Sequence, residues 1–242
     1  MPDQLPVVLE RKPGWAEIVI NRPERRNAII PPVSSAIADA LDEVADGPDI
    51  ASVLLRGAGG YFCSGIDLKA LQADPPPPWR GEQGASWRAL HLKLFAFDKP
   101  LVGAFERYGI NAGAALALAC DVLIAGESSF LQVGEVQQGA MAPMNMAWFK
   151  IKTTEQVLAR LAFYGDRIAG PEMLRLGLAA ECVPDGEVLA RSREVCERFA
   201  EYPAGATAGI KRGIIEQRGI EDPEAFFRQP TSNALLGAKM VK

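Results

Sequence analysis

Apolar segments of two kinds alternate along the first two thirds of the chain. Short continuous apolar runs bounded by turn residues have the length of buried strands, and they lie at residues 16–20, 52–55, 101–105 and 122–125. Segments with helical spacing or helix-forming composition lie between them, at residues 31–45, 66–71, 87–97 and 112–119. Strands that alternate with helices in this way predict βαβ units around a parallel sheet, and therefore an α/β fold.

The remainder of the chain, from residue 155 onward, is predicted to be mostly helical. Residues 187–201 and 206–217 are the clearest amphipathic helices in it. The four consecutive prolines at 75–78 are compatible with neither a helix nor a central strand, so they predict an exposed loop.

Composition narrows the class of protein and of partner. The chain has 242 residues, of which 48% are hydrophobic, and this is enough for one sizeable core. A formal net charge of −4 provides no strong basic field, so nucleic acid is not an expected partner. The longest apolar stretch is interrupted by Asp121 and is too short to cross a bilayer, so no membrane partner is expected either.

The cysteines carry information about compartment and metal binding. Cys63, Cys120, Cys182 and Cys196 form no CxxC pair and no metal-ligand spacing, so no metal site is expected. Scattered cysteines in a chain of this length are typical of reduced thiols in a cytoplasmic protein. The first residues show no basic segment followed by an apolar one, so we expect no signal peptide.

The first segment that could contribute to a reactive site is residues 60–68. In this segment a buried strand leads through a glycine turn into the start of a helix. Free backbone N–H groups and the positive end of the helix dipole allow such a turn to bind a developing oxyanion. Gly65 would let the backbone approach a ligand closely, and Asp67 suits the first helical turn. Spacing alone still favours an ordinary strand–turn–helix connection.

The second segment is residues 111–121, a helix composed almost entirely of glycine and alanine. Because such a helix can be packed closely on all sides, its first turn can lie deep inside the fold. Buried N–H groups there need an acceptor, which a substrate carbonyl can supply. A tightly packed core helix without a ligand is an equally good interpretation of this segment alone.

Together these segments resemble the two oxyanion-hole segments of the crotonase (enoyl-CoA hydratase/isomerase) superfamily. One family segment ends in a phrase like F-x-S-G-x-D-L, which Phe62 to Leu68 match, and the other is a Gly/Ala-rich helix that ends in C-D. Further matches keep the family order: N-R-P-E-R-R-N-A at 21–28, K-P-L-V-G-A at 99–104, and G-D-R-I, G-L-A and V-P within 165–184.

The resemblance implies a crotonase-like spiral of repeated ββα units. Residues 1–186 would form the core with the CoA-thioester site, and residues 187–242 a helical region for trimer contacts, in a homotrimer or a hexamer made of two trimers. The substrate would be an acyl-CoA thioester, with no separate cofactor because coenzyme A belongs to the substrate. Substrate and CoA contacts are carried over to Asn27, Ala28, Cys63, Ser64, Gly65, Asp67, Leu68 and Gly113.

The same resemblance assigns catalytic roles. The backbone N–H groups of Ile66 and Ala112 would hold the thioester oxygen. Ala115 occupies the place where hydratases of the family carry the first catalytic glutamate, and Glu135 matches the second. A single carboxylate suits movement of a proton between two carbons, so double-bond isomerisation is favoured. The alternatives are a hydratase with an atypical second group and a catalytically silent CoA-ester-binding paralogue. Decarboxylation and C–C cleavage of an acyl-CoA, which use the same oxyanion hole in the family, also stay open.

Other residues receive plainer interpretations. The Glu106–Arg107 pair is interpreted as a solvated, ion-paired turn, although Glu106 is the first place to look for a second catalytic group. His91 is the only histidine and is expected to be a partly buried packing residue. Residues 142–147 lack the glycines usual in the family, so they line a narrower, methionine-rich acyl pocket or simply fill the core.

Overall fold

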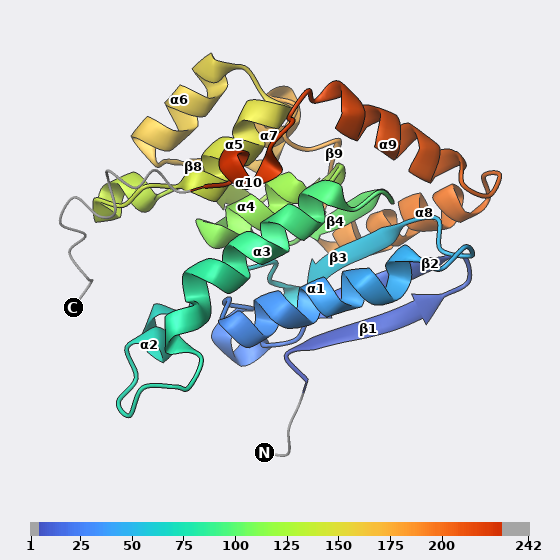
Figure 1. Cartoon of the computed structure of the whole chain (residues 1–242). Helices are drawn as coiled ribbons and strands as arrows, with labels where there is room; N and C mark the ends of the chain where they lie inside the picture. The colour runs from blue at the N-terminus through green and yellow to red at the C-terminus, as the bar shows by residue number, and fades with distance from the viewer. Residues whose placement is uncertain (1–4, 229–242) are drawn as a thin grey trace.

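A computed structural model of the chain describes residues 5–228, and its strands form two sheets (Figure 1). The larger sheet has the order β1 (Val7–Lys12), β2 (Trp15–Ile20), β3 (Val53–Gly57), β4 (Leu101–Phe105), β6 (Val122–Gly126) and β9 (Glu181–Val183). Only β1 runs antiparallel to its neighbour in this sheet. The smaller sheet consists of β5 (Tyr108–Ile110), β7 (Phe130–Gln132) and β8 (Arg167–Ala169).

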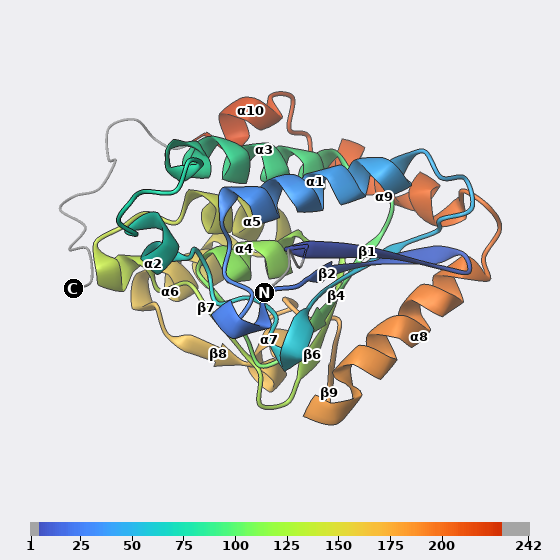
Figure 2. The same cartoon turned by 90° about the horizontal axis from the view of Figure 1, so that it is seen from below.

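Helices cover both faces of the larger sheet (Figure 2). Helices α1 (Pro31–Ala45) and α3 (Gln83–Ala96) lie side by side over one face, and α8 (Val188–Ala200) covers the other. Successive strand residues therefore enter different apolar clusters: Leu55 faces α1 and α3, whereas Leu54 packs in the cluster that includes Val195. Burial on both faces explains why these strands are continuous apolar runs in the sequence.

The chain advances in repeated strand–strand–helix turns. In one turn β4 lies in the larger sheet, β5 in the smaller sheet, and α4 (Ala112–Ala119) follows. The next turn repeats this with β6, β7 and α5 (Pro143–Lys152). An earlier turn has β3, then Cys63 in a parallel bridge with Gly109 of β5, then α2 (Leu68–Leu71). Equivalent positions of successive turns are thereby stacked on one another.

The predicted α/β class is confirmed, and the predicted strands and helices recur with small shifts at their ends. The sequence analysis did not identify β1, which has six residues. It also missed four strands of three residues each, β5, β7, β8 and β9. It also named no separate helices at α6 (Glu155–Tyr164) and α7 (Gly170–Arg175), or at α10 (Pro223–Phe226). Within residues 5–228, no helix has the length and hydrophobicity required to cross a membrane.

The proposed division into a core, residues 1–186, and a C-terminal helical region, residues 187–242, remains a prediction. The last part of the helical region, residues 229–242, lies outside the described residues. Helix α8 contributes buried Val188, Val195 and Cys196 to the cluster beneath the larger sheet. Helix α9 (Ala206–Gln217) is held by Lys211, whose ammonium group donates to both carboxylate oxygens of Asp121. One of these oxygens also accepts the backbone N–H of Leu101 at 2.8 Å, so the pair ties α9 to β4.

We predict that Lys211→Met destabilises the protein by roughly 3 kcal/mol, because it leaves the carboxylate of Asp121 largely buried without its cation. The side chains of Lys211 and Asp121 are only 3% and 16% exposed. Urea unfolding followed by circular dichroism measures the change. The control is Arg212→Met, which removes an exposed pair with Asp98 and should cost less than about 1 kcal/mol. Equal effects of the two substitutions would contradict the prediction.

Candidate active site

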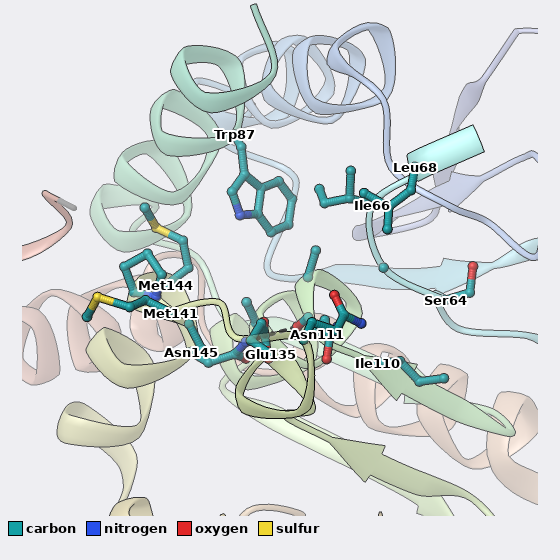
Figure 3. Close-up of a pocket in the computed structure, with 16 residues that line it drawn as sticks. Ser64, Ile66, Leu68, Trp87, Ile110, Asn111, Glu135, Met141, Met144 and Asn145 are labelled. Atoms are coloured by element: carbon teal, nitrogen blue, oxygen red, sulfur yellow. Dashed lines mark hydrogen bonds between the residues drawn. The ribbon is translucent and has the colours of Figure 1, made fainter. Parts of the chain in front are cut away.

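A pocket of about 310 Å³ lies where the three strand–strand–helix turns meet (Figure 3). Two of these turns contribute residues that follow β5 and β7, and the earlier turn contributes residues that follow its bridge at Cys63. Helices α3 and α5 add the remaining walls. The lining residues are Ser64, Gly65, Ile66, Leu68, Trp87, Ile110, Asn111, Ala112, Ala115, Glu135, Gln138, Met141, Ala142, Pro143, Met144 and Asn145.

Two backbone donors lie at equivalent places in neighbouring turns. The bridge between Cys63 and Gly109 fixes their register, and Ile66 and Ala112 each follow three residues after it. Both residues line the pocket, and neither N–H donates a hydrogen bond to another group among residues 5–228. The Ala112 N–H also lies at the first position of α4, where the helix dipole favours negative charge. This arrangement can hold a thioester oxygen as it becomes negative.

Glycines allow the two donor segments to approach each other. Gly65 has φ +99°, and a Cβ there would lie 2.9 Å from the carbonyl oxygen of Ile110. A Cβ on Gly113 would collide with the carbonyl oxygen of Cys63. Because that carbonyl also accepts the N–H of Ile110 at 3.1 Å, it cannot simply move away. Small residues at these positions are therefore required for the pocket to form.

Glu135 is the first residue of a short 3₁₀ helix, Glu135–Gln138, which follows β7. Its side chain belongs to a residue that lines the same pocket as Ile66 and Ala112. Burial raises the pKa of its carboxyl to about 7, against the lowering effects of its own backbone N–H and the Asn145 amide. Its Oε1 accepts from Asn145 Nδ2 at 3.0 Å, whereas Oε2 is buried and accepts from no other described residue. A carboxyl with this pKa can accept and return a proton near neutral pH.

Asn111 and Asn145 hold the loop that carries Glu135 against α4. Asn111 precedes α4 with φ +51°, and its Oδ1 accepts the N–H of Gly134 at 2.8 Å. Its carbonyl oxygen accepts both from Ala115 N, at 3.1 Å, and from Asn145 Nδ2, also at 3.1 Å. The Glu135 carboxylate and the Ala112 N–H are thus fixed to the same helix start.

The rest of the pocket is largely apolar. Figure 3 shows Trp87 from α3 above the pocket, with Met141 and Met144 along one side. Ala115, at the place of the first glutamate of hydratases, is fully buried and lines the pocket without adding a polar group. Glu135 is therefore the only carboxylate among the lining residues. Within residues 142–147, Met144 lines the pocket and also belongs to the hydrophobic core, so both sequence-based interpretations of this segment apply in part.

The residues predicted from the sequence divide into two groups. Those that line the pocket are Ser64, Gly65, Ile66, Leu68, Ala112 and Glu135. Those that do not line it are Asn27, Ala28, Cys63, Asp67 and Gly113. Contacts of these residues with coenzyme A stay predictions.

Asn27 and Asp67 stabilise the segments around the first donor. Asn27 is fully buried, and its Nδ2 donates to the carbonyl oxygens of Ala58 and Tyr61 at 2.9 and 2.6 Å. Ala28 offers its carbonyl oxygen to the guanidinium of Arg22.

Asp67 caps α2 by accepting from Ala70 N at 3.0 Å. It also pairs with Arg22 and Arg25 at 3.1 and 2.8 Å, and these hydrogen bonds lower the pKa of its carboxyl despite burial. Cys63 is fully buried, and burial raises the pKa of its thiol to about 12, so it is no nucleophile.

Glu106 and Arg107 do not line the pocket, and no ion pair joins them within residues 5–228. Burial raises the pKa of the Glu106 carboxyl, and the guanidinium of Arg107 lies 4.7 Å from the centre of the Tyr61 ring. The expected ion-paired turn is therefore absent. His91 is a packing residue, as expected, but it is fully buried: Trp148 Nε1 donates to its Nδ1 at 2.8 Å, and burial lowers its pKa to about 3.

Sequence reasoning assigned no site role to Asn145, Asn111 or Trp87. The signal for Asn145 is a lone amide in the apolar segment 143–149, and for Asn111 a polar residue directly before a Gly/Ala helix. Trp87 gives no such signal, since its place at the pocket results from how α3 packs. No cluster of three or more potential metal ligands occurs among residues 5–228.

Comparison of the sequence with known proteins identifies one family and several relatives within it. A family model described as enoyl-CoA hydratase/isomerase matches residues 10–225. Enoyl-CoA hydratase EchA19 of Mycobacterium tuberculosis is 32% identical over 93% of this chain and 85% of the relative. The (E)-benzylidenesuccinyl-CoA hydratase of Thauera aromatica is 29% identical over 87% of this chain and 82% of the relative.

Solved structures agree with these sequence relatives. The crystal structure of carnitinyl-CoA hydratase from Mycobacterium avium is 30% identical and superposes with a TM-score of 0.78. The match covers 94% of this chain and 92% of that protein.

We predict that Gly113→Ala lowers turnover at least ~100-fold, the usual effect of losing one oxyanion donor. The new Cβ would collide with the Cys63 carbonyl and displace the start of α4. Steady-state kinetics on an acyl-CoA substrate measures the effect. The matched control is Gly209→Ala in α9, which has open space and should leave turnover unchanged while stabilising its helix. Full activity in Gly113→Ala would show that the thioester oxygen binds elsewhere.

We predict that Glu135→Gln makes the protein more stable at pH 8. A rise of the pKa from the ordinary 4.5 to about 7 corresponds to roughly 3 kcal/mol of stability that is present below pH 4.5 and lost as pH rises through 7. The amide is never charged and avoids this loss. Melting curves of the two proteins should coincide near pH 4 and separate at pH 8. Coincidence at both pH values would contradict the raised pKa.

Proposed function

The chain belongs to the enoyl-CoA hydratase/isomerase family, and from this premise we propose that it reversibly adds water to the double bond of a 2-enoyl-CoA thioester. The sequence alone favoured isomerisation because only one carboxylate remained. Two observations support hydration instead: both curated relatives described above are named hydratases, and the pocket holds a second buried polar group, the amide of Asn145, beside Glu135.

The backbone donors would carry the first part of the reaction. Attack at the β carbon moves electrons onto the thioester oxygen, and the N–H groups of Ile66 and Ala112 would stabilise that charge. Each such donor contributes about 3 kcal/mol to the transition state. The apolar side chains of Trp87 and Met144 border the site, and a low local dielectric strengthens these interactions.

Glu135 would carry the proton. As a carboxylate it takes one proton from water while the water oxygen bonds to the β carbon and the double-bond electrons move toward the thioester. As a carboxylic acid it then returns that proton to the α carbon, which restores the carboxylate. A pKa of about 7 suits both directions of this transfer. We propose no cofactor, since coenzyme A belongs to the substrate.

Isomerisation remains the second candidate, and the observation that favours it is the alanine at position 115. With Glu135 as the only carboxylate lining the pocket, the simplest chemistry is transfer of one proton between the α and γ carbons.

The trimer or hexamer implied by the family resemblance also remains a proposal. Ile210 and Ile214 on α9 are 68% and 49% exposed, which suits contacts with another copy.

We predict that Glu135→Gln lowers hydration of trans-2-enoyl-CoA at least ~100-fold while CoA-ester affinity changes only a few-fold, because the donors are untouched. In the wild type, kcat/KM should fall as pH drops through about 7, where the carboxylate gains its proton. Loss of the enoyl-thioester absorbance and mass spectrometry of the products measure the reaction.

The products also separate the candidates. A β-hydroxyacyl-CoA supports hydration, a shifted double bond without added water supports isomerisation, and binding without turnover supports a silent paralogue. Full activity of Glu135→Gln would refute the role of this carboxylate.

A further inference from the structure

We propose that Asn145 is the second catalytic group and that its Oδ1, together with Glu135 Oε2, holds the water that attacks the substrate. The inference rests on the proposed hydration and names the atypical group that such a hydratase needs. Asn145 lies in the first turn of α5, is 2% exposed and lines the pocket beside Glu135 (Figure 3).

The orientation of the Asn145 amide follows from its partners. Its Nδ2 donates to the carbonyl oxygen of Asn111 at 3.1 Å and to Glu135 Oε1 at 3.0 Å. Both partners are acceptors, and reversing the amide would place its oxygen against both of them. Nδ2 must therefore take this position, and both of its hydrogens are used. Oδ1 is left as the free end of the amide.

Two buried oxygen atoms of these pocket-lining residues then remain without a hydrogen-bond donor. Asn145 Oδ1 and Glu135 Oε2 are both buried and accept from no other described residue. An unsatisfied buried acceptor costs about 1–3 kcal/mol, so this pair calls for a molecule that donates two hydrogen bonds. Water does so, and the pocket, at about 310 Å³, has room for it beside a substrate group.

A water held in this way is oriented for attack. When both of its hydrogens point to Asn145 and Glu135, its lone pairs face the pocket, where the β carbon would lie. The O–H bond directed to Glu135 breaks as the new C–O bond forms, and the proton passes to Oε2. The other O–H bond stays with the product as its hydroxyl group, still donating to Asn145 Oδ1.

This role explains how hydration proceeds with alanine at position 115. A second carboxylate would orient the water as an acceptor, and an amide oxygen is an acceptor too. Unlike a carboxylate it is neutral, so it adds no like charge beside Glu135. Glu106, the other candidate for a second group, does not line the pocket.

The experiment compares two reactions of Asn145→Ala. Hydration of trans-2-enoyl-CoA requires the held water, whereas exchange of the α hydrogens of a saturated acyl-CoA with deuterium oxide requires only Glu135 and the oxyanion donors. We expect hydration to fall at least ~100-fold and exchange to change less than about ten-fold. The matched control is Gln156→Ala, which removes an exposed amide on α6 outside the pocket and should leave both rates within a few-fold.

Other outcomes overturn the inference in distinguishable ways. Equal loss of hydration and exchange would mean that Asn145 only positions Glu135, and unchanged hydration would mean that it has no role. A wild type that exchanges but never hydrates would refute the proposed function, and the inference with it. Should Asn145→Ala not fold, a wild-type crystal structure decides: a water within hydrogen-bond distance of both Asn145 Oδ1 and Glu135 Oε2 supports the inference, and its absence at high resolution refutes it.

Discussion

The parallel alignment of β5, β7 and the segment at Cys63 that bridges to β5 is the constraint on which the site depends. Cys63 pairs with Gly109, and Gly109 in turn pairs with Leu131 of β7. A slip of one residue between any two would separate the groups that follow, because each segment continues directly into one functional element. The larger sheet is buried on both faces, and it supports these aligned segments from outside. The site is therefore built on the packed core.

The electrostatics of the pocket follow from placing one carboxylate in that rigid, apolar setting. The charged form of Glu135 is disfavoured by burial, and the structure offsets this only partly with the Asn145 amide. The backbone N–H groups of Ile66 and Ala112 have no hydrogen-bond acceptor among residues 5–228. A fold that satisfied these groups internally would be more stable and would lose the capacity to hold an oxygen or move a proton.

Much of the larger sheet was predictable because burial on both faces leaves continuous apolar runs in the sequence. The strands of the smaller sheet were not, since three residues give no periodicity. At the site, the backbone donors and Glu135 came from the family resemblance, which rests on ordered motifs. Asn145 could not be found in this way, because its role arises from the approach of α5 to the loop before it, which local sequence does not encode.

The donors proposed for the thioester oxygen are main-chain N–H groups, so the side chains of Ile66 and Ala112 would not be needed for the charge stabilisation itself. These side chains nevertheless border the space that an acyl group would occupy. Evolution or design can therefore exchange them, together with Ala115 and Met144, to admit longer, branched or ring-bearing substrates while the reaction chemistry stays in place. With the proposed donors in the main chain, substrate selectivity could change without a change in the catalytic groups, which would make the protein a suitable starting point for directed changes of substrate.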